Sequence, residues 1–313
     1  MVTTFYSTIA ANQQRAYMPA APIMVTATSY WSLGRRQSAG RRATGEILPV
    51  RIPAQVPEVA ADSGGFVAAT RMGGQYPFSA EQYIAWLRGI PRLSWAALPD
   101  LPVERQLASS RDTMRARQQL TLAYARELWG ASTEHASVPW AWVPTIQGQT
   151  PDDYLSMARE LADIMRDQLA AYDYTAYAYD TDDLDPELLA EAEHGARYRR
   201  VGIGSLCNRT SIAEIVTIVR TVAATLPGER FHLWGVKLSA IPALREAGLL
   251  DRIASLDSAT WNGRRGPALE LAKASPLSQA AHSWQVSWPA YAAKIDHQLT
   301  ATPPAAYQPG LAI

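Results

Sequence analysis

Short apolar segments alternate with amphipathic, helix-like segments along most of this chain, and that alternation restricts the fold more than any other feature. The apolar segments are expected as strands at residues 23–29, 56–61, 93–98, 140–146, 200–205, 231–236 and 254–257. Strands that alternate with helices form parallel sheets, because each helix returns the chain to the start of the next strand. Seven or eight such units in 313 residues fit a closed (β/α)8 barrel better than an open sheet.

No Pro-, Gly- or Ser-rich linker divides the chain, so the sequence predicts one α/β domain, a (β/α)8 TIM barrel. We expect the barrel to span residues 23–299. An N-terminal extension (1–22) precedes it in this interpretation, and a flexible tail (300–313) follows it. Within the barrel, residues 172–185 are expected as a short strand and a solvated loop, and residues 241–253 as a helix.

Capping residues mark three helix starts. Ser79 has Gln82 three residues later and Ser211 has Glu214, which are capping-box spacings. The stretch Thr150-Pro151-Asp152-Asp153 supplies a cap, a proline suited to the first turn and two acids at the positive end of the helix dipole.

Composition excludes several classes of protein. Lys and Arg number 29, as do Asp and Glu, so no net charge draws the whole molecule to nucleic acid. A single cysteine, Cys207, excludes an internal disulfide and a cysteine-rich zinc site, and we expect it to be a small buried filler. The five histidines show no metal-ligand spacing. No membrane span or signal peptide is evident, so a cytoplasmic protein without metal or cofactor is expected.

Polar residues and glycines stand at or just after the ends of the expected strands. They are Asp62, Ser63, Asp100, Gln147, Gly148, Gly204 and Asp257. The carboxyl ends of barrel strands meet at one face, where the active sites of such barrels form. We therefore expect these residues to line one site.

The same residues carry a resemblance to a known family. Asp62-Ser63-Gly64-Gly65-Phe66 resembles the signature of the tRNA-guanine transglycosylases, which exchange a guanine in a nucleic acid for a 7-deazaguanine. Four later stretches follow in that family's order: Leu98-Pro99-Asp100, Ile146-Gln147-Gly148, Val201-Gly202-Ile203-Gly204-Ser205, and Leu233-Trp234-Gly235-Val236 leading to Leu256-Asp257-Ser258. The sequences Gly-Ile-Gly-Ser-Leu-Cys and Leu-Asp-Ser-Ala-Thr-Trp are most similar to those of the DNA-modifying branch of the superfamily.

The resemblance implies a role for each residue. Asp257 matches the nucleophile that holds the sugar, and Asp100 matches the group that recognises the base and moves its proton. Asp62 and Ser63 match contacts to the purine or the sugar. Gln147 and Gly148 match a pair that recognises a carbonyl, and Gly204 would offer its backbone to the same heterocycle. Two displacements at one carbon give net retention, which is why the chemistry needs a nucleophile and a separate acid/base group.

The expected partners are DNA and a free 7-deazaguanine base of the 7-cyano or 7-aminomethyl type, with no membrane and an undetermined oligomeric state. Exchange in tRNA is the first alternative. It is disfavoured because the three-Cys, one-His zinc site of the tRNA enzymes is missing here. An N-glycoside hydrolase and a non-catalytic nucleic-acid-binding relative are further alternatives. A target base must leave the stack, and Trp31, Trp142 and Trp261 are candidates to stack on bases.

Six arginines are candidates for phosphate contacts. Arg35, Arg36, Arg41 and Arg42 cluster after the first expected strand, and Arg264 with Arg265 follows the last. Small residues between the first four let the backbone follow another chain.

Replacing Arg35, Arg36, Arg41 and Arg42 together with alanine is expected to weaken DNA binding and its salt dependence. Each lost phosphate contact lowers the slope of log affinity against log salt by about one. Titration of a labelled duplex at several salt concentrations measures this slope. An unchanged slope and affinity would show that the arginines are only solvated surface.

Overall fold

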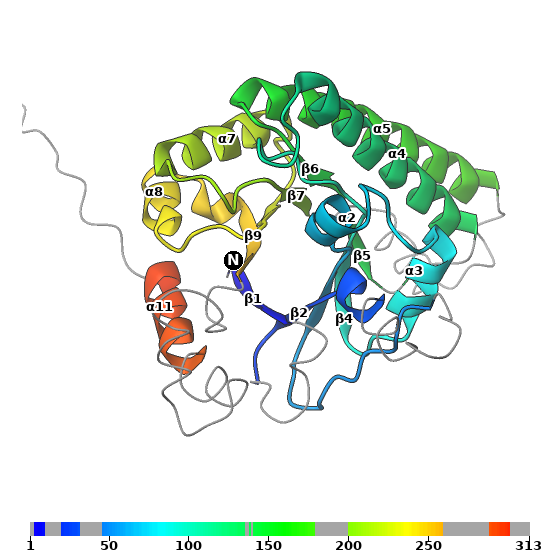
Figure 1. Cartoon of the computed structure of the whole chain (residues 1–313), viewed down its shortest axis with the longest axis horizontal. Helices are drawn as coiled ribbons and strands as arrows, with labels where there is room; N and C mark the ends of the chain where they lie inside the picture. The colour runs from blue at the N-terminus through cyan, green and yellow to red at the C-terminus, as the bar shows by residue number, and fades with distance from the viewer. Residues whose placement is uncertain are drawn as a thin grey trace, which may run out of the picture.

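A computed structural model of the chain describes residues 3–9, 20–31, 46–134, 138, 140–178, 200–258 and 288–300. Its centre is one parallel sheet with the strand order β5-β4-β3-β2-β1-β9-β8-β7-β6. The strands are β1 (Thr4–Ile9), β2 (Ile23–Thr26), β3 (Val59–Asp62), β4 (Leu93–Ala97), β5 (Ala141–Val143), β6 (Thr145–Ile146), β7 (Val201–Ile203), β8 (Phe231–Leu233) and β9 (Ile253–Ser258). Seen from one end, they form a ring (Figure 1).

The ring is closed by the chain itself, because only Pro144 separates β5 from β6. The carbonyl oxygen of Val143 accepts a hydrogen bond from Leu98 N at 3.0 Å, and that of Pro144 accepts one from Gly202 N at 2.7 Å. Residues 141–146 are thus one strand that bonds to β4 on one side and to β7 on the other. The predicted single-domain (β/α)8 TIM barrel is confirmed.

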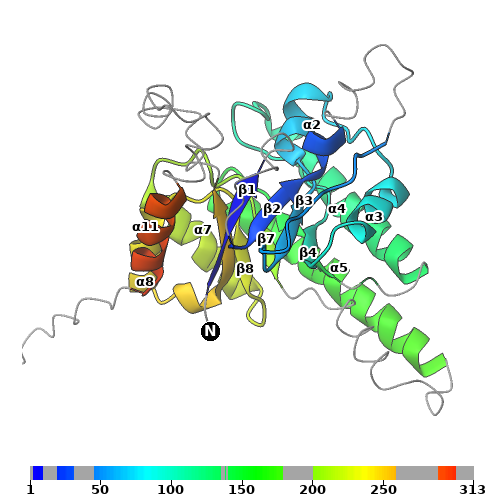
Figure 2. The same ribbon diagram turned by 90° about the horizontal axis from the view of Figure 1, so that it is seen from below.

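Helices cover the outside of the barrel. They are α2 (Gly65–Arg71), α3 (Ala80–Arg88), α4 (Arg111–Glu134), α5 (Pro151–Ala178), α7 (Ile212–Thr225), α8 (Ala240–Glu246) and α11 (Trp288–Thr300), with a 3-10 turn, η3 (Leu250–Arg252), before β9. Seen from the side, α8 and α11 lie on one flank of the strands and α3, α4 and α5 on the other (Figure 2). The predicted capping box is present, since Ser79 and Gln82 bond to each other's backbone N–H groups. Ser211 likewise accepts from Glu214 N.

The N-terminal boundary predicted at residue 23 is wrong. Residues 4–9 form β1, which pairs in parallel with β2 on one side and with β9 on the other. Polar Thr4 and Thr8, which lie on the same side of the strand as Tyr6, hide this strand in the sequence, because the interior of this barrel is itself partly polar. The barrel therefore begins at Thr4.

Two other expectations also need correction. Residues 172–178 continue α5 as helix and form no strand. The helix expected over 241–253 ends at Glu246, because Gly248 at φ +67° turns the chain out of the helix. The proposed tail, apart from Thr300 at the end of α11, lies outside the described residues.

The barrel interior is filled by a small cluster made of Tyr6, Met24, Ala60, Trp95, Ala141 and Val143. The Tyr6 and Trp95 rings meet edge to face with centroids 5.3 Å apart, and Trp95 Nε1 donates to Tyr6 OH at 2.9 Å. Tyr6 OH in turn donates to Glu58. The indole N–H of Trp95 and the hydroxyl of Tyr6 are therefore both hydrogen-bonded, although their rings are buried in the barrel.

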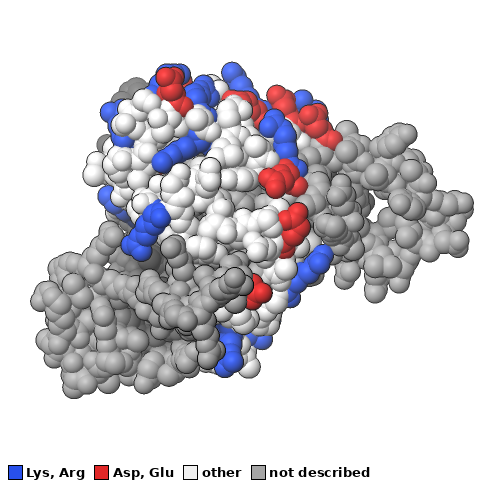
Figure 3. All heavy atoms as spheres, turned by 45° about the vertical axis from the view of Figure 1, so that its right-hand side comes forward, with Lys and Arg blue, Asp and Glu red and all other residues white. Residues whose placement is uncertain are grey.

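The outer surface has no dominant sign of charge on the face drawn in Figure 3, where basic and acidic side chains both occur. This agrees with the formal net charge of zero. In the part of the chain that the structure describes, no helix is long and apolar enough to cross a membrane.

Tyr6→Ala tests the revised boundary. The side chain is fully buried, so its loss is expected to lower the free energy of unfolding by about 3–5 kcal/mol. Urea unfolding measures the change. Phe66→Ala is the matched control, because that ring is 53% exposed, and it is expected to cost about 1 kcal/mol or less. Equal small losses in both variants would place residues 4–9 outside the core.

Candidate functional site

The predicted site residues in the described chain lie at one end of the barrel. Asp62 is the last residue of β3, and Asp257 stands next to last in β9. Asp100, Gln147 and Gly204 follow β4, β6 and β7 by one to three positions. This is the face at which parallel barrels hold their active sites.

Asp100 is the centre of a buried hydrogen-bond network. Its Oδ1 accepts from Ser63 Oγ at 3.4 Å, and its Oδ2 accepts from Gln147 Nε2. Tyr76 OH donates to Asp100 O at 2.8 Å and lies 2.8 Å from Ser63 Oγ. Ser63 and Gln147 thus hold the carboxyl group of Asp100, and Tyr76 holds its backbone.

Gln147 extends this network across the barrel. Its Oε1 accepts from Ser205 Oγ at 2.6 Å, and Ser205 Oγ also accepts from Val103 N at 3.0 Å. Gln118 Nε2 donates to Gln147 O at 2.6 Å. A side-chain amide that is fixed at both ends presents a defined pattern of donor and acceptor.

Asp257 lies at the same end in different surroundings. Its Oδ2 accepts from Thr8 Oγ1 and its Oδ1 from Gly235 N, both at 2.7 Å. His232 Nε2 lies 3.5 Å from Oδ1. The two donors come from β1 and from the loop after β8, so the carboxylate is held in one orientation.

The three aspartates are close enough to influence one another. Burial raises the pKa of Asp100 to about 7, and the charge of Asp62 adds to this rise. Burial also raises the pKa of Asp62 to about 6, opposed by a hydrogen bond from Gly64 and assisted by the charge of Asp257. A carboxyl group with a pKa near neutrality is suited to taking and giving protons.

Three glycines make room for neighbouring groups. A Cβ at Gly64 would lie 1.9 Å from Thr28 Oγ1, and one at Gly65 would lie 2.2 Å from Asp100 O. Gly204 leaves room for the Gln147 amide, which a Cβ would approach within 2.4 Å. Its backbone N donates to Ile146 O, and its carbonyl oxygen accepts from Tyr154 OH. The expected contact of the Gly204 backbone with a heterocycle stays a prediction.

Gly148 also has a packing role, since a Cβ there would lie 2.6 Å from the Tyr154 ring. Its carbonyl oxygen accepts from Arg209 at 3.0 Å. The same guanidinium bonds to Glu214 and to Ser205 O, so it ties together the loops after β6 and β7.

Sequence reasoning missed several residues of this site. Ser205 ends the motif that begins at Val201 but was given no role, and Tyr76 lies outside the quoted motifs. A hydroxyl group alone gives no signal in a sequence. Thr8 falls in the predicted N-terminal extension (1–22) and was not considered. His232 is not spaced from other histidines or acids in the way that metal ligands are. Glu104 follows Asp100 by four positions, is buried, and has an Oε2 without a hydrogen-bond partner among the described residues.

Other sequence expectations have mixed outcomes. Trp142 is buried in the core against Tyr83 and Trp140, so it is not available to stack on a base. Cys207 is exposed rather than a buried filler, and its thiol donates to Glu104 at 3.3 Å. The phosphate-contact candidates Arg35, Arg36, Arg41, Arg42, Arg264 and Arg265, together with Trp261, lie outside the described residues.

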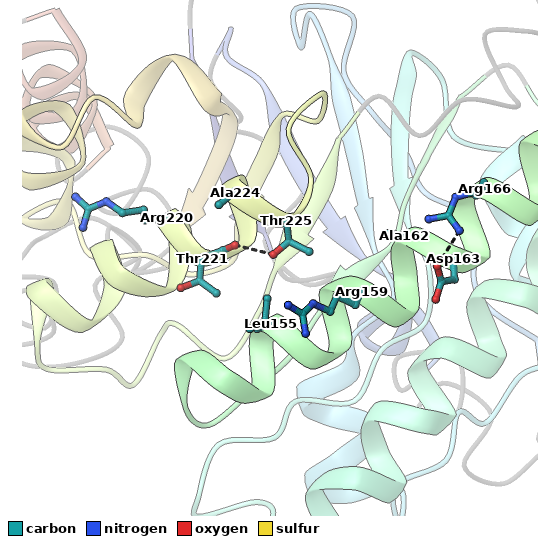
Figure 4. Close-up of a pocket in the computed structure, with 9 residues that line it drawn as sticks. All are labelled: Leu155, Arg159, Ala162, Asp163, Arg166, Arg220, Thr221, Ala224 and Thr225. Atoms are coloured by element: carbon teal, nitrogen blue, oxygen red, sulfur yellow. Dashed lines mark hydrogen bonds and ion pairs between the residues drawn. The ribbon is translucent and has the colours of Figure 1, made fainter.

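A groove on the outside of the barrel is a separate feature. It encloses about 720 Å³ between α5 and α7 and includes Arg159, Arg166 and Arg220 (Figure 4). Arg166 pairs with Asp163 at 3.0 Å, and both side chains are exposed. The groove therefore lacks the buried polar groups that orient a ligand. Within the described ranges, no three acidic, histidine or cysteine side chains are placed to hold a metal ion.

The fold and site define a closed parallel barrel with a cluster of carboxyl groups at the carboxyl ends of its strands. No family model matches the chain, and no curated protein matches it. Solved structures with a similar fold include a proposed fructose-1,6-biphosphate aldolase of Coccidioides immitis, at 10% identity and a TM-score of 0.41 over 94% of this chain and 90% of that one. Another is the carboxyl transferase domain of Rhizobium etli pyruvate carboxylase, at 13% identity and a TM-score of 0.32 over 97% of this chain and 50% of that one.

Neither similar structure is a transglycosylase, and at these scores neither bears on function. The resemblance to the transglycosylases therefore rests on the sequence motifs alone.

Asp100→Asn is expected to stabilise the protein above neutral pH. The folded protein keeps a proton on Asp100 up to about pH 7, whereas the unfolded chain releases it near pH 4. The parent therefore loses stability as pH rises from about 4 to 7, by roughly 4 kcal/mol at most. The variant escapes this loss, so its advantage should be absent at pH 4 and greatest at pH 8.

Urea unfolding of both proteins across this pH range measures the difference. The exposed carboxyl of Asp167 provides the control, since Asp167→Asn should show no such trend. A pH-independent difference for Asp100→Asn would contradict a raised pKa.

Proposed function

We propose that this protein is a base-exchange glycosyltransferase, a pentosyltransferase that replaces guanine in DNA with a 7-deazaguanine. One observation carries the proposal. Two buried carboxyl groups, Asp100 and Asp257, lie at the same end of the barrel, and each is held by hydrogen-bond donors. Burial and the neighbouring charge of Asp62 raise the pKa of Asp100 to about 7. A fixed carboxylate can act as a nucleophile, and a carboxyl group with a pKa near neutrality can carry a proton.

The first displacement breaks the bond between the sugar and guanine. A carboxylate oxygen of Asp257 forms a bond to C1′ as the bond from C1′ to the base breaks. Protonated Asp100 gives its proton to the departing base, which leaves as neutral guanine. The sugar then remains attached to Asp257 as an ester.

The second displacement reverses these steps with a different base. Asp100, now ionised, takes the proton from the ring nitrogen of the incoming 7-deazaguanine. That nitrogen attacks C1′ and releases the Asp257 carboxylate. Two inversions leave the new base on the same face of the sugar as the old one.

The side chains around Asp100 suit the recognition of a purine-like edge. Gln147 presents an amide, and Ser63 and Ser205 present hydroxyl groups, all within one connected network. In the structure these groups bond to one another. We expect a bound base to replace some of those bonds, so binding exchanges hydrogen bonds rather than creating unpaired groups.

We propose DNA as the nucleic-acid substrate for two reasons. The motif sequences are most similar to those of the DNA-modifying branch, and the zinc-binding cysteines of the tRNA enzymes are missing. A base inside a duplex is inaccessible, so the target must be flipped out or lie on a single strand. We place the reaction in the cytoplasm, where a free deazaguanine base and DNA meet.

Asp257→Asn is expected to lower the rate of base exchange by roughly a thousandfold or more, because an amide cannot form the ester. The assay uses a guanine-containing oligonucleotide, a labelled 7-deazaguanine base and mass spectrometry of the released nucleosides. Asp251→Asn is the control, since this exposed carboxyl lies in η3 before β9. A modified ribonucleoside from tRNA would instead support exchange in tRNA, and abasic sites would support hydrolysis. Exchange by Asp257→Asn at the parent rate would overturn the assignment.

A further inference from the structure

His232 is an ionisable side chain in the centre of the barrel that the proposed reaction does not yet use. It is completely buried, on β8. Its ring packs between those of Trp95 and Trp234, with centroids 4.8 and 4.3 Å away. The Tyr6 ring lies 6.4 Å from it on a third side.

A chain of polar groups leads through this imidazole to Asp257. Arg200 donates from a guanidinium N–H to Ser255 Oγ at 3.2 Å, and Ser255 Oγ lies 2.9 Å from His232 Nδ1. On the other side of the ring, Nε2 lies 3.5 Å from Asp257 Oδ1. Ser255 and Asp257 are two residues apart on β9 and therefore face the same side of the sheet.

The groups at the two ring nitrogens point to the one that carries the proton. A guanidinium only donates, so Ser255 Oγ accepts from Arg200 and its own hydrogen is available for His232 Nδ1, although this oxygen could also accept a second hydrogen. The carboxylate decides between the two tautomers because it can only accept, and we therefore assign the proton of the neutral ring to Nε2, facing Asp257. The opposite tautomer would point a bare nitrogen lone pair at Asp257 Oδ1.

We propose that His232 is a positioning residue that holds Asp257 Oδ1 through its Nε2–H group and leaves Oδ2 to attack the sugar. The role of Asp257 in this inference rests on the proposed function. Oδ1 faces two N–H groups, those of Gly235 and His232, that are fixed to the barrel. Among the described residues, the donor to Oδ2 is the hydroxyl of Thr8, which can rotate away.

The same arrangement serves both displacements. When Oδ2 bonds to the sugar, Oδ1 becomes the carbonyl oxygen of the ester and keeps its two N–H neighbours. When the ester breaks, the charge returns to a carboxylate whose donors are already in place. Preorganised donors of this kind lower the barrier because they need no rearrangement during the reaction. The contact from Nε2 is long for a hydrogen bond and is expected to shorten on substrate binding.

The surroundings keep the ring neutral. Burial lowers the pKa of His232, and the charge of Arg200 lowers it further, while Asp257 opposes both. Tyr6, Trp95 and Trp234 bring no charge to the ring. A neutral imidazole with a fixed tautomer is an orienting group rather than a proton carrier.

Two substitutions separate positioning from packing. His232→Gln keeps an N–H donor at nearly the place of Nε2, whereas His232→Leu fills the space without one. The measured quantity is the rate at which the covalent adduct, the ester between the sugar and Asp257, forms. We expect His232→Leu to lower this rate by roughly 10- to 100-fold, which is the loss seen when a group that orients a metal ligand is removed. His232→Gln should recover much of that rate, and the KM for the oligonucleotide should change in neither variant. Met24→Ala, in the same interior cluster, is the control for lost stability.

The outcomes distinguish this inference from the proposed function. Equal loss in His232→Gln, His232→Leu and Met24→Ala would show that the imidazole only packs. If the parent forms no adduct, the proposed function fails, and a second measurement still tests the imidazole. Nitrogen NMR of the parent should show a neutral ring protonated on Nε2, and Ser255→Ala should disturb that tautomer. A ring protonated on Nδ1 or on both nitrogens would overturn the inference whatever the activity.

Discussion

Closure of the sheet at Pro144 is the constraint on which the rest of the molecule depends. Strands of only two to six residues form few hydrogen bonds each and would leave exposed edges in an open sheet. Residues 141–146 bond to β4 through Val143 O and to β7 through Pro144 O, so no edge remains. The closed ring brings together, at one end, loops that lie far apart in the sequence, and the carboxyl groups gather because those loops do.

The carboxyl cluster carries an energetic cost that the scaffold must offset. Half-buried Asp62 and buried Asp100 lie near each other, and desolvation together with repulsion between carboxylates raises the pKa of both. A fold selected only for stability would place apolar or neutral groups there. The hydroxyls of Ser63 and Tyr76 and the amide of Gln147 supply bonds that keep Asp100 in place. The cluster is thus held by side chains whose own positions depend on the closed barrel.

The alternation of strands and helices was sufficient to predict the barrel and the end at which Asp62, Asp100, Gln147 and Asp257 lie, because that pattern reflects which residues must be buried. It was insufficient for β1, in which polar Thr4 and Thr8 lie on the same side as Tyr6 of the interior cluster. It also gave no sign that Gly64, Gly65 and Gly204 make room for Thr28, Asp100 and Gln147, which come from other parts of the chain. Ser205 and His232 gain their significance from distant partners, and no local pattern records such contacts. The assignments of function to these residues stay predictions.

The pairing of β1 with β9 has a consequence for how the protein is made. Thr3 and Ile253, which share a hydrogen bond, are 250 positions apart, and β9 carries Asp257. A chain emerging from the ribosome presents β1 first. Its partner β2 follows early, but its other partner, β9, appears only when nearly all the rest of the chain has been synthesised. Contacts of such long range slow folding and leave strand edges exposed meanwhile. Any product that terminates before residue 253 lacks both the last strand of the barrel and Asp257, so an incomplete chain can form neither the closed ring nor the carboxyl cluster at its end.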